Sequence, residues 1–292
     1  MTKTITILDG GMGREIKARL SSFDPLLWSA SAFDTNDELI IDIHRDFIAA
    51  GASVITTNNY AVVPAILEQA KIPHQFENFT KKSALLANQA CQQVTTDIKI
   101  AGSLPPLKST YRPDLALPKE EARPIYEQIS SWLAPIVDYL FIESMSSIDE
   151  ALSAFSVAKN VGLPIWISFI LDDQNPGHLL SGEHISDIPN HFPAKFVDAI
   201  LFNCCHAVTI TKGLQILSFD GLTGGYANAF TALTPNWTHG KLRGTDARMT
   251  PNIYLKHCQD WVDAGASIIG GCCGIGPTYI EQLNNLIATT DV

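Results

Sequence analysis

Short runs of apolar and β-branched residues recur along the whole chain and constrain its fold more than any other feature. Eight of these runs are nearly continuous in apolar residues, as strands buried on both faces of a parallel sheet are. They are Ile5–Leu8, Ser53–Thr57, Lys99–Gly102, Tyr139–Glu143, Ile165–Phe169, Ala199–Asn203, Gly221–Tyr226 and Ser267–Gly270. Longer amphipathic stretches separate them, which indicates repeated strand–helix units around one parallel sheet.

The stretches between these runs are patterned as helices. Apolar residues recur at helical spacing in Asp37–Ala50, Lys119–Val137 and Asp149–Asn160. Gly51 and Gly265 follow two such stretches, where a helix end favours a residue that tolerates a left-handed backbone. The two joins read alike, as repeated units do.

Eight strands alternating with helices in 292 residues predict the α/β class and a single (β/α)8 TIM barrel, since such barrels commonly have about 250 residues or more. The apolar fraction of 46% and the charged fraction of 17% are ordinary for a globular protein. No linker divides the chain, so we expect one barrel domain over residues 1–292.

Three segments that follow proposed strands exceed the usual connection of about 2 to 6 residues. They are Leu104–Pro118, Leu171–Phe192 and Asn228–Pro251. In a barrel such loops gather at the C-terminal face, where active sites are built. Their length is therefore suited to covering a substrate.

The composition excludes two classes of partner. A net charge of −10 and a pI near 5.2 are unsuited to a nucleic-acid surface, which needs clustered Lys and Arg. No apolar run reaches the roughly 18 to 20 residues that span a bilayer, and the N-terminus has no signal-type segment. We therefore expect a cytoplasmic protein whose partners are small molecules, with no nucleic acid and no membrane.

Six cysteines are too few for a disulfide scaffold in a chain of this length. Four of them form the adjacent pairs Cys204-Cys205 and Cys272-Cys273, which suggests metal binding or reactivity in a reducing compartment. Cys91 and Cys258 stand alone and are expected to be small buried hydrophobic residues.

The paired cysteines follow the sixth and eighth proposed strands, whose ends lie on the same barrel face. Three thiolates from Cys204, Cys272 and Cys273 would suit Zn²⁺, which favours sulfur and keeps an exchangeable fourth position in catalytic sites. In Gly270-Gly271-Cys272-Cys273-Gly274, the glycines permit the sharp bend that two adjacent ligands need.

The residues alone leave the ligand set open. Cys205 could replace Cys204, because alternate strand residues face opposite ways and only one of the pair points inward. His206 and His44 are further possible ligands. A fourth ligand such as Cys205 or His206 would close the site and make the protein a non-catalytic zinc barrel.

Several motifs resemble those of the zinc-dependent homocysteine S-methyltransferases, which include enzymes using S-methylmethionine or betaine, and the resemblance covers almost the full chain. The matching pieces are Asp9-Gly10-Gly11-Met12-Gly13, Thr56-Thr57-Asn58, Glu143, Asn203-Cys204 and Gly270-Gly271-Cys272-Cys273-Gly274. Two positions depart from the family pattern. Leu201 stands where a Gly is usual, and Tyr226-Ala227-Asn228 replaces a Tyr-Pro-Asn stretch.

The resemblance implies that Cys204, Cys272 and Cys273 hold the zinc ion, and it favours Cys204 over Cys205 because the family cysteine directly follows the Asn. It also implies a site for the amino-acid part of homocysteine. The residues that it assigns to that site are Asp9, Gly10, Glu143 and Asn203. Carboxylates suit this role because they complement the substrate ammonium group.

The activity that the resemblance implies is methyl transfer from a sulfonium donor, S-methylmethionine or S-adenosylmethionine, to the thiol of homocysteine, forming methionine. Betaine or another onium compound is the alternative donor, and a zinc enzyme that activates water is a rival activity. Aromatic side chains could hold a cationic donor by cation–π contact. The candidates are Trp28, Tyr60, Tyr111, Phe169 and Tyr226.

Overall fold

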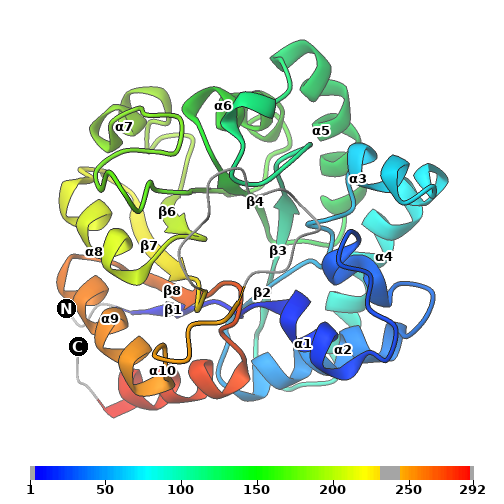
Figure 1. Cartoon of the computed structure of the whole chain (residues 1–292), viewed down its shortest axis with the longest axis horizontal. Helices are drawn as coiled ribbons and strands as arrows, with labels where there is room; N and C mark the ends of the chain where they lie inside the picture. The colour runs from blue at the N-terminus through cyan, green and yellow to red at the C-terminus, as the bar shows by residue number, and fades with distance from the viewer. Residues whose placement is uncertain (1–3, 231–243, 290–292) are drawn as a thin grey trace.

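A computed structural model describes residues 4–230 and 244–289 and shows eight parallel strands in one sheet, in the order β1-β8-β7-β6-β5-β4-β3-β2. A parallel bridge between Leu8 and Val54 joins the two ends of this sheet, so the strands form a barrel (Figure 1). The strands are β1 (Thr6–Ile7), β2 (Val54–Thr56), β3 (Lys99–Leu104), β4 (Tyr139–Met145), β5 (Ile165–Phe169), β6 (Ala199–Asn203), β7 (Leu222–Ala227) and β8 (Ile268–Gly271). The predicted (β/α)8 TIM barrel is confirmed.

The helices surround the barrel as an outer ring (Figure 1). They are α1 (Met12–Arg19), α2 (Asp37–Ala49), α3 (Pro64–Gln69), α4 (Phe76–Gln92), α5 (Lys119–Leu133), α6 (Ile148–Ala158), α7 (Ile188–His191), α8 (Ala207–Ile216), α9 (Pro251–Asp263) and α10 (Pro277–Thr289). Short 3₁₀ turns lie at η1 (Trp28–Ala32), η2 (Pro73–Gln75), η3 (Pro113–Leu115) and η4 (Ile185–Asp187).

The element ends follow local chemistry. Helix α5 ends at Leu133, before the predicted end at Val137, because Pro135 has no backbone N–H with which to continue the helical hydrogen bonds. Gly51 and Gly265 have φ values of +108° and +99°, as expected of residues that end helices. The long segment after β5 contains α7 and η4, so it is more ordered than a plain loop. Most of the long segment after β7 lies outside the described residues.

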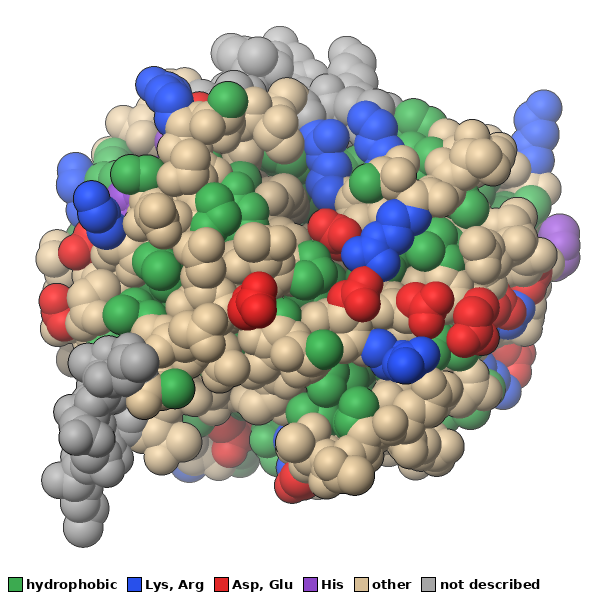
Figure 2. Space-filling view, turned by 90° about the horizontal axis from the view of Figure 1, so that it is seen from below, with side chains coloured by type: hydrophobic (Ala, Val, Ile, Leu, Met, Phe, Trp, Pro, Cys, Tyr) green, Lys and Arg blue, Asp and Glu red, His purple; other side chains and the backbone are tan. Residues whose placement is uncertain are grey.

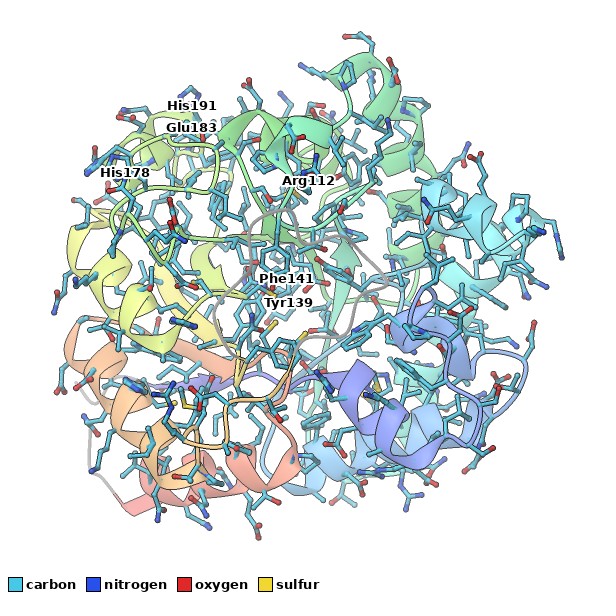
Figure 3. The ribbon with its side chains drawn as sticks, in the orientation of Figure 1. Arg112, Tyr139, Phe141, His178, Glu183 and His191 are labelled. Atoms are coloured by element: carbon cyan, nitrogen blue, oxygen red, sulfur yellow. The ribbon has the colours of Figure 1, made fainter. Side chains whose placement is uncertain are left out.

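Aromatic rings fill the barrel interior. Tyr139 stacks on Trp166 with ring centroids 4.3 Å apart, and Phe141 contacts the edge of Trp166 at 5.9 Å. Tyr139 and Phe141 lie at the centre of the barrel in Figure 3. Leu201 packs into this interior cluster and pairs with Gly224 of β7. The Leu that departs from the family pattern is thus accommodated opposite a residue without a side chain.

The second hydrophobic layer lies between the barrel and its helices and contains most of the buried apolar residues. On the side of the molecule shown in Figure 2, acidic and basic side chains are interspersed rather than gathered by sign. Arg19 of α1 forms an ion pair with Asp46 of α2. No helix within the described residues is long and apolar enough to cross a membrane.

His44 of α2 gives a test of the packing. Its side chain is 0% exposed, and neither ring nitrogen has a hydrogen-bond partner among the described residues. Burial lowers the pKa of His44 from 6.5 to about 3. Below pH 6.5 the His44 imidazole is therefore protonated in the unfolded chain but stays neutral in the folded chain. The free energy of unfolding falls by about 1.4 kcal/mol per pH unit until the folded pKa is reached.

We expect His44→Leu to flatten the decline in the free energy of unfolding between about pH 6 and pH 4, measured by urea unfolding. The variant should be no less stable than the parent at neutral pH, because two unpaired buried nitrogens are removed. His74→Leu, which changes an exposed side chain of η2, is the control. If the free energy of unfolding of His44→Leu fell with pH as steeply as that of the parent, the assigned role of His44 would be contradicted.

Candidate active site

A pocket opens at the C-terminal face of the barrel, where the strand ends meet. Its lining includes the segments 9–13, 56–58, 143–144 and 271–273 together with Cys204. Aromatic side chains from the interior cluster, Phe141 and Tyr226, also line it. The base of the pocket is therefore continuous with the barrel core.

Three of the six cysteines meet in this pocket. The sulfur atoms of Cys204 and Cys272 are 2.7 Å apart, although 68 residues separate them in the chain. The Cys273 thiol hydrogen-bonds with both. None of the three forms a disulfide, and no group of three or more His, Cys, Asp or Glu side chains within residues 4–230 and 244–289 is already arranged as metal ligands.

The turns that present these thiols are tight. Cys204 directly follows β6 with a left-handed φ of +55°, and Gly274 after Cys273 has φ +87°. Gly270 and Gly271 serve close packing instead, since a Cβ atom would lie 2.4 Å from the Cβ of Leu8 or 2.2 Å from the Ile275 side chain. Of the three glycines expected to permit the bend, only Gly274 has the left-handed conformation.

The cluster holds its protons at neutral pH. The hydrogen bond with Cys272 lowers the pKa of Cys204, but the bond with Cys273 and burial outweigh it and raise this pKa to about 12. Hydrogen bonds with Cys204 and Cys273, together with burial, also raise the pKa of Cys272. A thiolate here therefore needs a nearby cation that replaces the proton.

Two buried carboxyl groups face the same pocket. Asp9 is 6% exposed and accepts hydrogen bonds from the backbone N–H of Thr56 at 2.8 Å and from its hydroxyl at 3.3 Å. Glu143 is 9% exposed and accepts a hydrogen bond from the hydroxyl of Ser103. Burial is the main reason why the pKa of Asp9 rises to about 7 and that of Glu143 to about 8. A positively charged ligand between them would favour their ionised forms.

Most of the aromatic candidates lie where a cationic donor could reach them. Those that line the pocket are Trp28, Tyr60, Tyr111 and Tyr226. Phe169 does not: it is buried outside the pocket lining, with its ring 5.7 Å from that of Phe192, so its assignment is wrong. Phe141 and Phe230 also line the pocket and were missed, because nothing in the sequence separates them from ordinary core residues.

The other candidates lie outside the pocket lining. Cys205 is 2% exposed within the hydrophobic core, and the imidazole of His206 lies 3.8 Å from the carboxylate of Asp173. His44 is buried in α2. Asn203 is fully buried, and its side-chain amide donates to the hydroxyl of Ser144 at 2.7 Å.

The lone cysteines differ in exposure. Cys258 is buried as expected, and Cys91 is half-buried against the core. Neither lines the pocket. Both therefore behave as packing residues rather than as part of the thiol cluster.

Ser144 is a pocket residue that sequence reasoning overlooked. It follows Glu143 at an irregularity of β4, where the register with β5 shifts between Ile142 and Met145, and it has φ +61°. Its hydroxyl donates to the Cys204 sulfur at 3.8 Å, and its backbone N–H donates to the Ser168 hydroxyl at 3.0 Å. The only signal in the sequence was its position beside Glu143 at a strand end.

The fold and the pocket together define a class: a barrel enzyme whose C-terminal face combines clustered thiols with buried carboxyl groups. The family model described as homocysteine S-methyltransferase matches residues 6–287. The chain therefore belongs to the homocysteine S-methyltransferase family and is an enzyme that transfers a methyl group to homocysteine.

Individual relatives agree with this assignment. The chain is 29% identical to a homocysteine S-methyltransferase of Escherichia coli (strain K12), over 96% of this chain and 94% of that protein. It is 26% identical to a betaine-homocysteine S-methyltransferase of Drosophila melanogaster, over 97% of this chain and 96% of that protein. The crystal structure of the homocysteine methyltransferase MmuM from Escherichia coli in its metallated form superposes with a TM-score of 0.81, at 25% identity, covering 97% of this chain and 96% of that one.

Gly11 tests how tightly the cysteine turn is packed. Its φ of −77° is open to any residue, but a Cβ atom would lie 2.6 Å from the Cys272 carbonyl oxygen and 3.0 Å from the Gly274 nitrogen. We expect Gly11→Ala to lower the free energy of unfolding by about 1 to 3 kcal/mol and to reduce methyl transfer.

Gly162→Ala is the matched control, because its Cβ meets nothing within 4 Å and its φ of +89° adds only conformational strain, about 1 kcal/mol. It should leave methyl transfer intact. Thermal unfolding and turnover of both variants would decide the matter, and equal turnover would show that Gly11 does not shape the cysteine turn.

Proposed function

We propose that the protein transfers a methyl group from a sulfonium donor, S-methylmethionine or S-adenosylmethionine, to homocysteine, with zinc held by Cys204, Cys272 and Cys273. One observation carries the proposal. Three thiols from two distant segments converge in a pocket that also holds two carboxyl groups and, among its described lining residues, no Lys, Arg or His.

The donor set fits the ion. Thiolates are soft ligands that zinc prefers, and three protein ligands are typical of its catalytic sites. The similar Escherichia coli structure is of a metallated form. When bound, zinc supplies its charge to deprotonate the incoming homocysteine thiol at neutral pH.

The carboxyl groups bind the amino-acid part of the acceptor. Asp9 and Glu143 come from the ends of β1 and β4, so together they offer carboxylate oxygens to one ammonium group from two directions. Gly10 belongs to the same site, because it lines the pocket and a Cβ there would lie 2.2 Å from the Ile275 carbonyl oxygen. Asn203 acts on the acceptor site indirectly, through its hydrogen bond to Ser144, which lines the pocket.

A cationic donor suits this pocket, because its lining combines carboxyl groups and thiols with aromatic rings. An onium methyl group is attracted to aromatic faces such as those of Tyr60, Tyr111 and Tyr226. Sulfonium donors carry the positive charge on the sulfur that bears the transferable methyl. The acceptor sulfur attacks that methyl carbon, the donor's carbon–sulfur bond breaks with its electron pair leaving on the donor sulfur, and a neutral sulfide departs. The same charge argument admits betaine, which the experiment includes.

The test supplies zinc-loaded protein with homocysteine and, separately, S-methylmethionine, S-adenosylmethionine or betaine, and measures methionine. We expect formation with a sulfonium donor. Cys272→Ala should lose zinc and lower turnover by about 100-fold or more, because one ligand is missing. Cys91→Ala, outside the pocket, should retain both. Equal turnover in the two variants, or methionine formation with betaine alone, would refute the proposal as stated.

Glu143→Gln tests the acceptor site. The substitution keeps the size of the side chain and removes a charge-assisted interaction, so the KM for homocysteine should rise by about 10- to 100-fold while zinc content is unchanged. Glu150→Gln is the control. Glu150 is also a buried carboxyl, with its pKa raised to about 7 by burial, but it binds the Ser146 N–H outside the pocket. Steady-state kinetics that leave the KM of Glu143→Gln unaltered would remove Glu143 from the site.

A further inference from the structure

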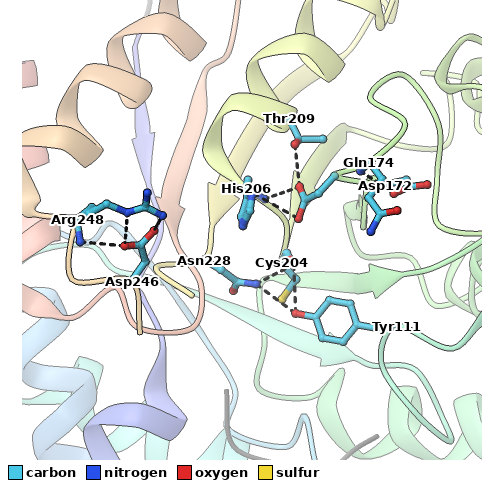
Figure 4. A network of polar contacts seen from close by, with 10 residues as sticks. Tyr111, Asp172, Gln174, Cys204, His206, Thr209, Asn228, Asp246 and Arg248 are labelled. Atoms are coloured by element: carbon cyan, nitrogen blue, oxygen red, sulfur yellow. Dashed lines mark hydrogen bonds and ion pairs between the residues drawn. The ribbon is translucent and has the colours of Figure 1, made fainter. Parts of the chain in front are cut away.

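Two side chains converge on the backbone carbonyl of Cys204. The hydroxyl of Tyr111, in the loop between β3 and α5, donates to this oxygen at 3.1 Å, and the side-chain amide of Asn228 donates to it at 2.7 Å. The Asn228 amide also donates to the Tyr111 hydroxyl at 3.2 Å. Figure 4 shows the three residues as one network. Segments that follow three different strands thus meet at one peptide group.

That peptide group belongs to a residue in an unfavourable conformation. A left-handed φ of +55° at Cys204 is costly for a side chain with a Cβ and persists only where the surroundings hold it. Tyr111 is itself left-handed, with φ +66°. The two hydrogen bonds to the Cys204 carbonyl oxygen restrict rotation of the following peptide group, and so they help hold the strained backbone from which the Cys204 sulfur lies 2.7 Å from that of Cys272.

A second hydrogen bond holds the loop that carries Tyr111 against the pocket. The hydroxyl of the preceding residue, Thr110, hydrogen-bonds with the hydroxyl of Tyr60 at 2.6 Å. Thr110, Tyr111 and Tyr60 all line the pocket. Seating of the loop and the Tyr111 hydrogen bond are therefore parts of one arrangement.

We propose that Tyr111 and Asn228 are positioning residues that hold the Cys204 backbone so that its sulfur faces Cys272 and Cys273. The Tyr111 bond makes this orientation depend on the seated β3–α5 loop. The consequences for zinc rest on the proposed function, whereas the positioning of Cys204 concerns the protein alone and is tested without metal.

The first experiment alkylates the metal-free protein with iodoacetamide and follows each cysteine by peptide mass spectrometry. Tyr111→Phe removes only the hydroxyl, so we expect Cys204 to be alkylated about fivefold faster as its turn opens more often. Tyr279→Phe is the matched control, because its hydroxyl also donates to a backbone carbonyl, that of Met249, at 2.6 Å and outside the pocket. It should leave the Cys204 rate unchanged.

The second experiment uses zinc-loaded protein. Tyr111→Phe should lower the affinity for zinc about tenfold in a chelator competition and should also lower kcat. Its melting temperature should equal that of Tyr279→Phe. Asn228→Asp replaces the donating amide by an oxygen of the same size and should weaken zinc to a similar extent. Because both side chains act on one carbonyl, the double variant should lose less than the sum of the single losses.

The outcomes separate the two proposals. A parent protein that neither retains zinc nor forms methionine would contradict the proposed function. The alkylation rates would still test whether Tyr111 and Asn228 position Cys204. An active parent protein whose Tyr111→Phe and Asn228→Asp variants match Tyr279→Phe in alkylation and zinc affinity would overturn the positioning inference. Should Tyr111→Phe melt earlier than the control, Asn228→Asp carries the same test.

Discussion

The register of three neighbouring strands is the constraint on which the site depends. In β6, β7 and β8, Asn203 pairs with Tyr226, which pairs with Gly270. The residues just beyond Asn203 and Gly270 therefore lie at the same height, with one strand between them. Gly224 in that middle strand allows close approach, because a Cβ there would lie 2.0 Å from the Ile268 carbonyl oxygen. A slip of one residue in β6 would turn Cys204 away from the pocket and Cys205 toward it.

Charge compensation is the second theme of the site. Cys204, Asp9 and Glu143 all have a raised pKa, so the pocket without ligands is held close to neutral by bound protons. Each ligand in the proposed reaction brings a positive centre: the metal, the acceptor ammonium group and the donor sulfonium sulfur. Binding thus exchanges protons for cations, which is less costly than burying carboxylates or thiolates alone.

Much of the fold could be predicted from the sequence, since all eight strands are nearly continuous apolar runs and the periodicity of α2, α5 and α6 is strong. The convergence of Cys204, Cys272 and Cys273 followed from the rule that parallel strand ends share one barrel face. What could not be predicted depends on backbone torsions and long-range packing. The left-handed Ser144 at the β4 irregularity is one example, and the Tyr111 bond to Cys204 across 93 residues is another. Phe169 failed as a pocket residue because an apolar run does not reveal which side of a barrel wall a ring occupies.

The aromatic interior of the barrel sets a limit on how this scaffold changes. Phe141 and Tyr226 belong both to the pocket base and to the cluster that contains Trp166. A deeper pocket would require smaller side chains in this aromatic cluster and would leave a cavity in the barrel interior. A cavity of that size lowers the free energy of unfolding by several kcal/mol. Space for a larger methyl donor must therefore come from changes in the loops that follow the strands. Differences in donor choice within this architecture are thus confined to those loops, while the barrel interior is retained.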